Sequence, residues 1–268
     1  MSFLHRDGCD LYYEVTGHGP PIVFAHGLGG NHLSWWQQIP HFRDHYTCVT
    51  FAHRGFTPST DAPNGPGPAA FVDDLAALID HLDLANVRLV AQSMGGWSCL
   101  GYAVQYPERV RALVMAATVG SLAHPEVDYL LTAAGTTQAA LFKRGIHPAA
   151  GERMAREQPA LHYLYTEISD LSIGLDKERL RRDLYALRTT PADAVAALRL
   201  PVLCISGEED VVIPTGAVAL LAEIIPAATM VRVPDAGHSV YFEQPEAFNR
   251  LVDDFFRDTS IGAAGAWE

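Results

Sequence analysis

The sequence has few cysteines, few basic residues and no long apolar run. Its 4 cysteines, Cys9, Cys48, Cys99 and Cys204, are widely separated in 268 residues and form no Cys-x-x-Cys pair. Three of them lie inside apolar runs, which predicts reduced, buried thiols rather than disulfides or metal ligands. The 19 Lys and Arg residues against 31 Asp and Glu give a net charge of −12. Nucleic acids and anionic membranes bind basic surfaces, so neither is an expected partner.

Signals for membrane insertion, secretion and cofactor binding are also missing. No stretch approaches the roughly 18 apolar residues of a membrane span, and the first residues lack the apolar core of a signal peptide. We therefore expect a cytoplasmic protein. The sequence contains no His-Glu-x-x-His pattern, no Cys/His cluster and no glycine-rich nucleotide loop in the required context. We accordingly expect neither a metal nor a cofactor.

Short apolar strands alternate with amphipathic helices along the chain. Strands are expected at 10–16, 21–25, 46–52, 87–92, 110–118, 201–206 and 229–233, and helices near 71–82, 94–106, 216–225 and 248–256. This alternation predicts an α/β fold, with a mostly parallel sheet covered by helices on both faces. In the helix near 71–82, Asp73, Asp74 and Asp80 lie opposite the apolar stripe.

The segment from Ser121 to Thr190 interrupts the alternation, because it contains only helical stretches broken by glycine and proline. We expect residues 1–120 and 191–260 to form the core, residues 121–190 to form an inserted helical lid or cap, and residues 261–268 to be a flexible tail. Such an insertion usually covers the carboxyl ends of the strands, where open α/β sheets bind their ligands.

Ser93 follows a buried strand and precedes a helix, within the segment Leu-Val-Ala-Gln-Ser-Met-Gly-Gly-Trp. That context is typical of a nucleophile elbow, a turn so sharp that the serine side chain stands clear of the sheet. The small residues Ala91 and Gly95 avoid a clash across the turn, although the first position is usually glycine. A serine that only caps an ordinary helix would produce a similar local pattern.

A second glycine-rich segment, His26-Gly27-Leu28-Gly29-Gly30, follows an earlier strand. Glycines here let backbone amides turn toward the elbow, so the amides of Leu28 and Met94 are candidates for an oxyanion hole. We expect His26 to bond this loop rather than to take part in catalysis.

Two later loops supply an acid and a base. Asp210 lies in an acidic turn after one strand, and His238 lies in the loop after the last strand. The chain order Ser93, Asp210, His238 is the nucleophile–acid–base order of the α/β-hydrolases.

Together these motifs resemble the α/β-hydrolase superfamily over about residues 8–257. The resemblance implies that Ser93 attacks a carbonyl carbon, that His238 transfers the proton and that Asp210 orients the imidazole. Glu208, Glu209 and Asp235 are the alternatives for the acid. Haloalkane dehalogenases and epoxide hydrolases of this superfamily carry aspartate at the nucleophile position, so the serine disfavours those chemistries.

Within the superfamily, the Leu28 loop resembles that of carboxylesterases and enol-lactonases, which implies hydrolysis of a carboxylic ester or lactone through an acyl-enzyme. Residues 118–120 and 248–252 resemble meta-cleavage product hydrolases, which cleave a carbon–carbon bond of a vinylogous diketone. Those enzymes typically carry asparagine where this chain has Gln92. A triad-bearing ligand receptor with slow turnover is a third alternative.

The expected substrate is a small apolar or aromatic ester or lactone, because aromatic residues follow the oxyanion loop and recur in the cap. The candidates for the pocket wall are Trp35, Trp36, Phe142, Tyr163 and Tyr165. The net charge disfavours an anionic substrate at long range unless cap residues such as Arg144, Arg153 and Arg156 offset it. The sequence indicates no oligomeric state.

Overall fold

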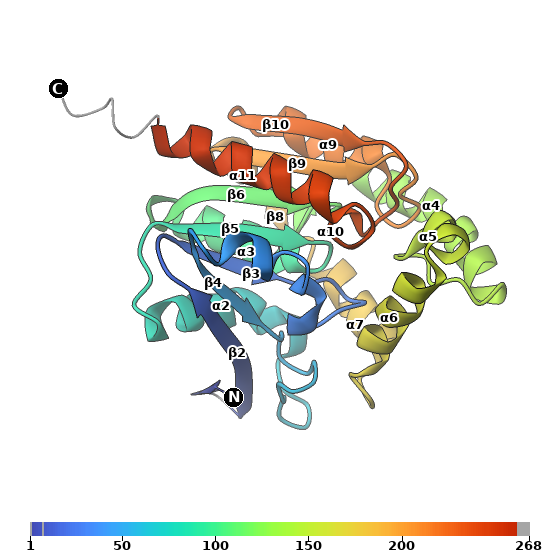
Figure 1. Ribbon diagram of the computed structural model, residues 1–268, viewed down its shortest axis with the longest axis horizontal. Coiled ribbons are helices and arrows are strands. Elements are labelled where there is room, and N and C mark those ends of the chain that lie inside the picture. Colours follow the sequence, from blue (N-terminus) through green and yellow to red (C-terminus); the bar gives the residue numbers. More distant parts are fainter. Residues whose placement is uncertain (1, 7, 262–268) are drawn as a thin grey trace.

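A computed structural model describes residues 2–6 and 8–261, and its centre is an eight-stranded sheet (Figure 1). The expected tail at 261–268 falls outside this range except for residue 261, the last of the C-terminal helix. The strands of the sheet are β1 (Ser2–Arg6), β2 (Cys9–Gly17), β3 (Pro21–Ala25), β4 (Thr47–Phe51), β5 (Val87–Gln92), β6 (Val110–Ala116), β9 (Val202–Gly207) and β10 (Ala228–Val233).

The strand order is β1-β2-β4-β3-β5-β6-β9-β10. The six strands from β4 to β10 pair in parallel, whereas β1 and β2 form an antiparallel edge. Strand β1 was not expected from the sequence, since its residues are only half-buried and show no apolar run.

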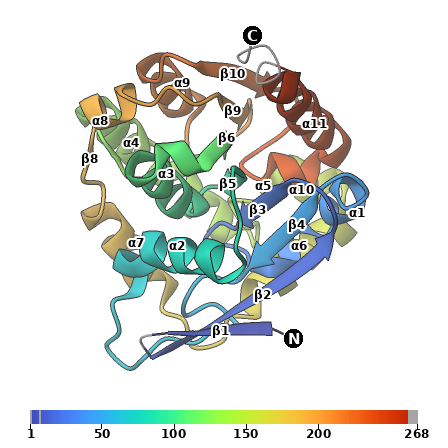
Figure 2. The ribbon, with the colours of Figure 1, turned by 90° about the vertical axis from the view of Figure 1, so that its left-hand side faces the viewer.

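Helices cover both faces of the sheet (Figure 2), with α2, α3 and α9 on one side and α1 and α11 on the other. The helical elements outside the cap are η1 (His32–Trp35), α1 (Ile39–Phe42), η2 (Gly67–Ala70), α2 (Phe71–His81), α3 (Gly95–Gln105), η3 (Pro107–Arg109), α8 (Ala192–Ala196), α9 (Thr215–Ile224), α10 (Val240–Glu243) and α11 (Pro245–Ile261). Within residues 2–6 and 8–261, none of the helices combines the length and the apolar character that crossing a bilayer requires.

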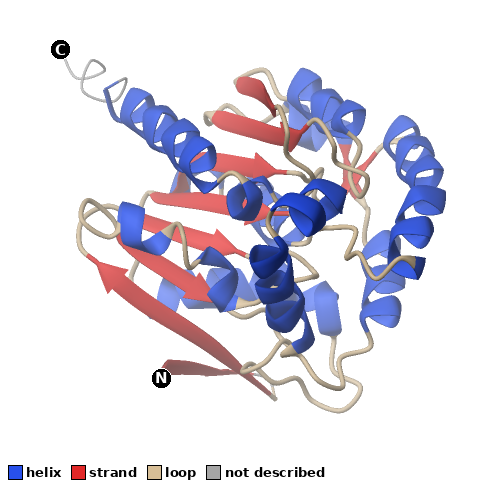
Figure 3. Cartoon of the chain, turned by 45° about the vertical axis from the view of Figure 1, so that its right-hand side comes forward, coloured by secondary structure: helices blue, strands red, loops and turns tan. Residues whose placement is uncertain are grey.

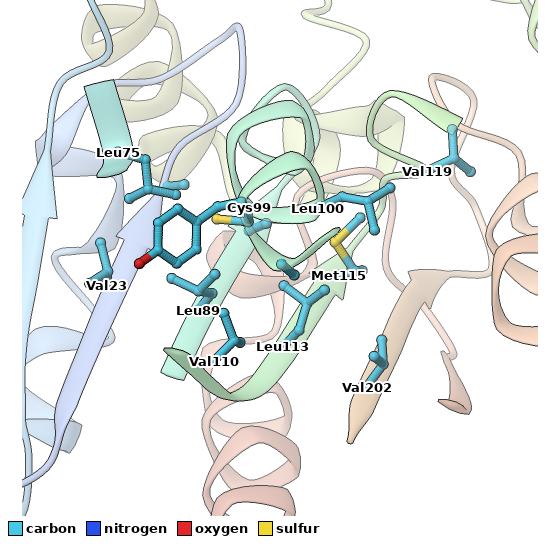
Figure 4. Close-up of a cluster of buried hydrophobic side chains, with 14 of the residues drawn as sticks. Val23, Leu75, Leu89, Cys99, Leu100, Val110, Leu113, Met115, Val119 and Val202 are labelled. Atoms are coloured by element: carbon cyan, nitrogen blue, oxygen red, sulfur yellow. The ribbon is translucent and has the colours of Figure 1, made fainter. Parts of the chain in front are cut away.

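Alternate residues of each central strand enter different cores. On β5, Leu89 packs with α2 and α3, whereas its neighbour Val90 packs on the opposite face with α11. On β6, Leu113 and Met115 face the same way as Leu89, and Figure 4 shows them beneath the side chains of α2 and α3. A strand that is buried on both faces reads as a continuous apolar run, which explains why these strands could be predicted.

The chain leaves the sheet after β6 and returns before β9. Between them lie β7 (Leu122–Ala123), α4 (Pro125–Lys143), α5 (Gly151–Glu157), α6 (Pro159–Asp170), α7 (Lys177–Ala186) and β8 (Thr190–Pro191). We call residues 121–190 the cap segment. Its helices lie beyond the edge of the sheet toward which most strand arrows point (Figure 3).

The two ends of the cap segment are joined to each other. Strands β7 and β8 form a short parallel pair, and the Thr190 N–H donates to the Ser121 carbonyl at 3.0 Å. The two side-chain hydroxyls are also 2.7 Å apart. Because entry and exit are tied together, the segment can be inserted without opening the sheet. No strand was expected here, since two residues are too few to give a sequence pattern.

A buried ion pair anchors the loop after β4 to α2. The guanidinium of Arg54 donates from Nε and Nη2 to the two carboxylate oxygens of Asp74, each at 2.6 Å. Its Nη1 also donates to Asp61 at 3.1 Å. Asp74 was expected on the polar side of its helix, but it is almost completely buried because this partner neutralises it.

Replacing Arg54 by Met removes both hydrogen bonds to the buried Asp74 carboxylate and leaves it with the longer ion pair to Arg6, whose Nε is 3.4 Å from Oδ1. We expect this to lower the free energy of unfolding by about 3–5 kcal/mol, measured by urea denaturation. The matched control is Arg109→Met, which removes a more exposed pair with Asp80 (2.7 Å); we expect it to cost less than about 1 kcal/mol. Equal losses in the two variants would contradict the anchoring role.

Candidate active site

The turn between β5 and α3 positions Ser93. Its φ is +49°, in the left-handed region that residues with a side chain rarely adopt. The Ser93 N–H donates to the Ala116 carbonyl at 3.0 Å, and the Thr118 hydroxyl donates to the Ser93 carbonyl at 2.6 Å. These bonds hold the turn against β6 and the residues after it. The Ser93 side chain lines a cavity at the end of the sheet.

Close backbone packing makes the turn possible. A Cβ atom at Gly95 would lie 2.1 Å from the Ala25 carbonyl oxygen, and one at Gly27 would lie 2.0 Å from Oε1 of Gln92. Neither position therefore accepts a side chain without displacing its neighbour. Ala91, in contrast, is fully buried with its methyl group accommodated, so alanine fits where the pattern usually has glycine.

Leu28 and Met94 lie beside Ser93 at the same cavity. Within the described part of the chain, neither backbone N–H donates to an acceptor. Two unpaired N–H groups next to a serine are what the stabilisation of a developing oxyanion requires. These two groups therefore remain the candidate oxyanion hole.

His26 holds the Leu28 loop from beneath. Its Nε2 accepts a hydrogen bond from the His53 N–H at 3.0 Å, so the ring proton resides on Nδ1, which donates to the Gly27 carbonyl at 2.8 Å. Burial lowers the pKa of His26 to about 3, and the ring is neutral at physiological pH. The contacts of His26 are thus those of a loop-bonding residue, as expected.

His238 and Asp210 form a buried pair. The Nδ1 of His238 donates to Oδ2 of Asp210 at 2.9 Å. The second carboxylate oxygen accepts from the Val212 and Ile213 N–H groups at 2.7 and 2.9 Å. This carboxylate is therefore fixed, and it holds the imidazole with Nε2 as the unprotonated nitrogen. The His238 side chain lines the same cavity as Ser93.

The other acids that could have faced His238 lie elsewhere. Glu209 and Asp235 are exposed, and both pair with Arg153. Glu208 is exposed as well. Among the hydrogen bonds and ion pairs of the described residues, Asp210 is the carboxylate that contacts His238.

A second buried carboxylate holds the His238 loop and was missed in the sequence. Glu243 accepts from the Gly237 N–H at 2.8 Å and from the Ser239 N–H at 3.0 Å, the residues on either side of His238. From the other side, the Gln92 amide donates to the His238 carbonyl at 3.3 Å. Nothing local distinguishes Glu243 from a surface glutamate, because its partners come from a turn that only the folded chain creates.

The cavity at Ser93 has a volume of about 340 Å³, a size suited to a small organic ligand. Both the core and the cap segment contribute walls. Of the five aromatic residues expected to line the pocket, Phe142 and Tyr165 do so. Trp35, Trp36 and Tyr163 do not border this cavity.

Packing explains these three differences. Trp35 is fully buried on one face of the sheet, with ring centroids 5.1 Å from Phe24 and 4.7 Å from Tyr241. Trp36 and Tyr163 are exposed on the outer surface. Neighbouring positions in the sequence could not reveal which aromatic side chains turn inward.

Polar residues of the cap that were not singled out also reach the cavity. His147 accepts from the Ala149 N–H on Nδ1 at 3.2 Å, so its proton lies on Nε2. Burial, aided by the nearby Lys177 charge, lowers the pKa of His147 to about 4, and the ring is neutral. Arg188 borders the cavity too. No group of three or more His, Cys, Asp or Glu side chains within the described ranges is arranged to hold a metal ion.

Comparison with known proteins identifies the family. The model of the alpha/beta hydrolase fold matches residues 20–167, and a second model, described as TAP-like protein, matches residues 185–267. The chain therefore belongs to the α/β-hydrolase family, which confirms the predicted fold class.

Individual relatives cover almost the whole chain. "Putative non-heme bromoperoxidase BpoC" of Mycobacterium tuberculosis is 30% identical over 92% of this chain and 97% of that protein. The 3-oxoadipate enol-lactonase 2 of Acinetobacter baylyi is 29% identical over 91% of each. Among solved structures, a thermophilic esterase from Thermogutta terrifontis superposes with a TM-score of 0.75 at 25% identity, covering 94% of both chains.

The environment of Glu243 predicts a pH dependence of stability. Burial raises its pKa to about 7, above the ordinary value of 4.5, although its two backbone hydrogen bonds act in the opposite direction. The folded protein therefore retains a proton that the unfolded chain releases, and this favours folding at low pH. We expect that contribution to be lost as pH rises from about 4.5 to about 7.

Urea denaturation across this pH range tests the assignment. The Glu243→Gln variant cannot titrate, so its free energy of unfolding is expected to fall less steeply with pH than that of the native protein. The control Glu246→Gln removes an exposed carboxylate and is expected to keep the native slope. A native slope in Glu243→Gln would contradict the assignment.

Proposed function

We propose that the protein hydrolyses a carboxylic ester or lactone through an acyl-enzyme formed on Ser93. The observation that supports this most directly is the arrangement at one cavity: a strained serine turn, two unpaired backbone N–H groups, and a histidine whose Nδ1 is bonded to a buried carboxylate. Two of the relatives are named an enol-lactonase and an esterase, that is, enzymes that hydrolyse lactones and esters. Their names support the same class of substrate for this protein.

Acylation begins when Ser93 Oγ attacks the carbonyl carbon and His238 Nε2 takes the hydroxyl proton. Negative charge develops on the carbonyl oxygen, and the N–H groups of Leu28 and Met94 stabilise it. Asp210 stabilises the imidazolium that forms, since its carboxylate accepts from Nδ1. The alkoxide then leaves with the proton from His238. In a lactone it stays attached to the acyl group.

Deacylation repeats these steps with water. His238 removes a proton from the water molecule, the resulting hydroxide attacks the acyl carbon, and the serine oxygen recovers the proton as the acid is released. The same buried pair, His238 and Asp210, therefore transfers the protons in both acylation and deacylation.

The resemblance to the putative bromoperoxidase points to a second reaction of the same intermediate. Hydrogen peroxide can replace water as the attacking nucleophile, and the product is then a peracid instead of a carboxylic acid. Assays with added peroxide and acetate would detect this activity by peracid-dependent oxidation of bromide.

Ser93→Ala removes the nucleophile, and we expect turnover of 4-nitrophenyl butyrate to fall by about 10⁴-fold or more. The matched control is Gln105→Ala, which changes an exposed side chain at the far end of the same helix, outside the cavity, and is expected to stay within about threefold of native. Retained turnover in purified Ser93→Ala would contradict the proposed function.

Asp210→Asn tests the acid separately. The amide can no longer stabilise the imidazolium, and it favours the wrong tautomer of His238, so kcat is expected to fall by about 10³- to 10⁴-fold. Glu209→Gln and Asp235→Asn alter exposed carboxylates that pair with Arg153, and little change in kcat is expected. If Asp210→Asn kept its activity and one of the two controls lost it, the residue changed in that control would be the catalytic acid.

A further inference from the structure

Arg188 carries a buried charge at the wall of the cavity. Its side chain is only 5% exposed, and its guanidinium lies over the rings of Trp97 and Tyr185, at 5.3 and 4.7 Å from their centroids. Trp97 is on α3, one helical turn after Ser93, and both border the cavity together with Arg188. The cation therefore contacts one ring from α3 of the core and one from α7 of the cap segment.

This guanidinium lacks acceptors. Within the described residues, Nε and Nη1 of Arg188 are buried and have no hydrogen-bond partner. The nearest carboxylate is that of Asp128, whose Oδ1 is 3.7 Å from Nη1, too far for a hydrogen bond, and which is itself 60% exposed. Burying a charged donor without an acceptor is unfavourable, and Nη2, which is not among these fully buried atoms, is the guanidinium nitrogen that a ligand in the cavity can approach.

The other cations at the cavity are already engaged. Lys177 donates from Nζ to the carbonyl and hydroxyl of Ser169, at 2.6 and 2.8 Å. Arg181 pairs with Glu178 on its own helix. Among the cavity-lining cations of the described chain, Arg188 alone has no hydrogen-bonded protein partner.

The cap arginines that could offset the negative net charge for an anionic substrate do not supply positive charge at the cavity. Arg144 and Arg156 pair with glutamates of the cap, and Arg153 pairs with Glu209 and Asp235 of the core. None of the three arginines borders the cavity at Ser93. Arg188, which does border the cavity, is a positive charge that can offset the net charge of −12 locally.

We propose that Arg188 binds a carboxylate of the substrate, so that the preferred ester or lactone is an anion. This inference rests on the proposed function at Ser93. Guanidinium N–H groups match the geometry of a carboxylate, and stacking on aromatic rings restricts the guanidinium so that little freedom is lost when the ligand binds. The rest of the substrate extends past Trp97, with its carbonyl at Ser93 and its carboxylate at the cap.

A pair of chromogenic esters of equal chain length tests the proposal. One is the mono-4-nitrophenyl ester of hexanedioic acid, which carries a free carboxylate, and the other is 4-nitrophenyl hexanoate, which does not. For the native protein, we expect kcat/KM to be about tenfold or more higher with the anionic ester.

Arg188→Met keeps the length of the side chain and removes its charge. We expect it to lower the preference for the anionic ester about 10- to 100-fold, mainly through KM, with the neutral ester within about threefold of native. Arg188→Lys restores part of the preference. The control Arg181→Met removes a cavity cation that is already paired, and the preference is expected to stay native.

The outcomes distinguish a failure of the proposed carboxylate site from a failure of the proposed function at Ser93. Equal losses on both esters in Arg188→Met, or no preference in the native protein, would overturn the carboxylate site and leave the esterase assignment standing. Turnover of neither ester by the native protein would contradict the proposed function and, with it, this inference.

A measurement on the native protein covers the case in which Arg188→Met does not fold. Hexanedioate and hexanoate ions both offer a carboxylate to the oxyanion site, but only hexanedioate offers a second one to Arg188. We expect hexanedioate to inhibit turnover of the neutral ester about tenfold more strongly than hexanoate. Equal inhibition constants would overturn the proposal.

Discussion

The site depends on one steric constraint, the contact between α3 and β3 beneath Ser93. Because a Cβ at Gly95 would lie 2.1 Å from the Ala25 carbonyl, the helix can start this close to the sheet only with glycine there. That closeness forces the chain through a turn with Ser93 at φ +49°. The same turn leaves the Met94 N–H without a partner and places the serine at the end of the sheet, facing the loop of Leu28.

Much of this arrangement could be predicted because it is encoded locally. The parallel strands are buried on both faces, so each reads as an apolar run, and the serine turn has a strand before it and glycines after it. Asp210 and His238 each follow a strand, and parallel strands bring their carboxyl ends to one edge. The spatial pairing of these two residues at 2.9 Å follows from that topology.

The parts that could not be predicted depend on which polar and aromatic side chains the folded chain buries, and most of their contacts join distant segments. Asp74 has the position of a surface residue on its helix and is buried because Arg54 and Arg6 both reach its carboxylate. Trp35 follows the oxyanion loop but turns into the sheet core. Glu243 and Arg188 look like ordinary surface charges in the sequence, yet one holds the His238 loop and the other lines the cavity. Buried charges of this kind show only when their surroundings are known.

The most direct test of the central claim, a nucleophilic Ser93, is covalent labelling of the native protein with a 4-nitrophenyl alkylphosphonate. We expect release of one equivalent of 4-nitrophenol per chain and a matching mass increase on the peptide that contains Ser93. Inhibition of turnover without a label on that peptide, or a label on another residue, would contradict it.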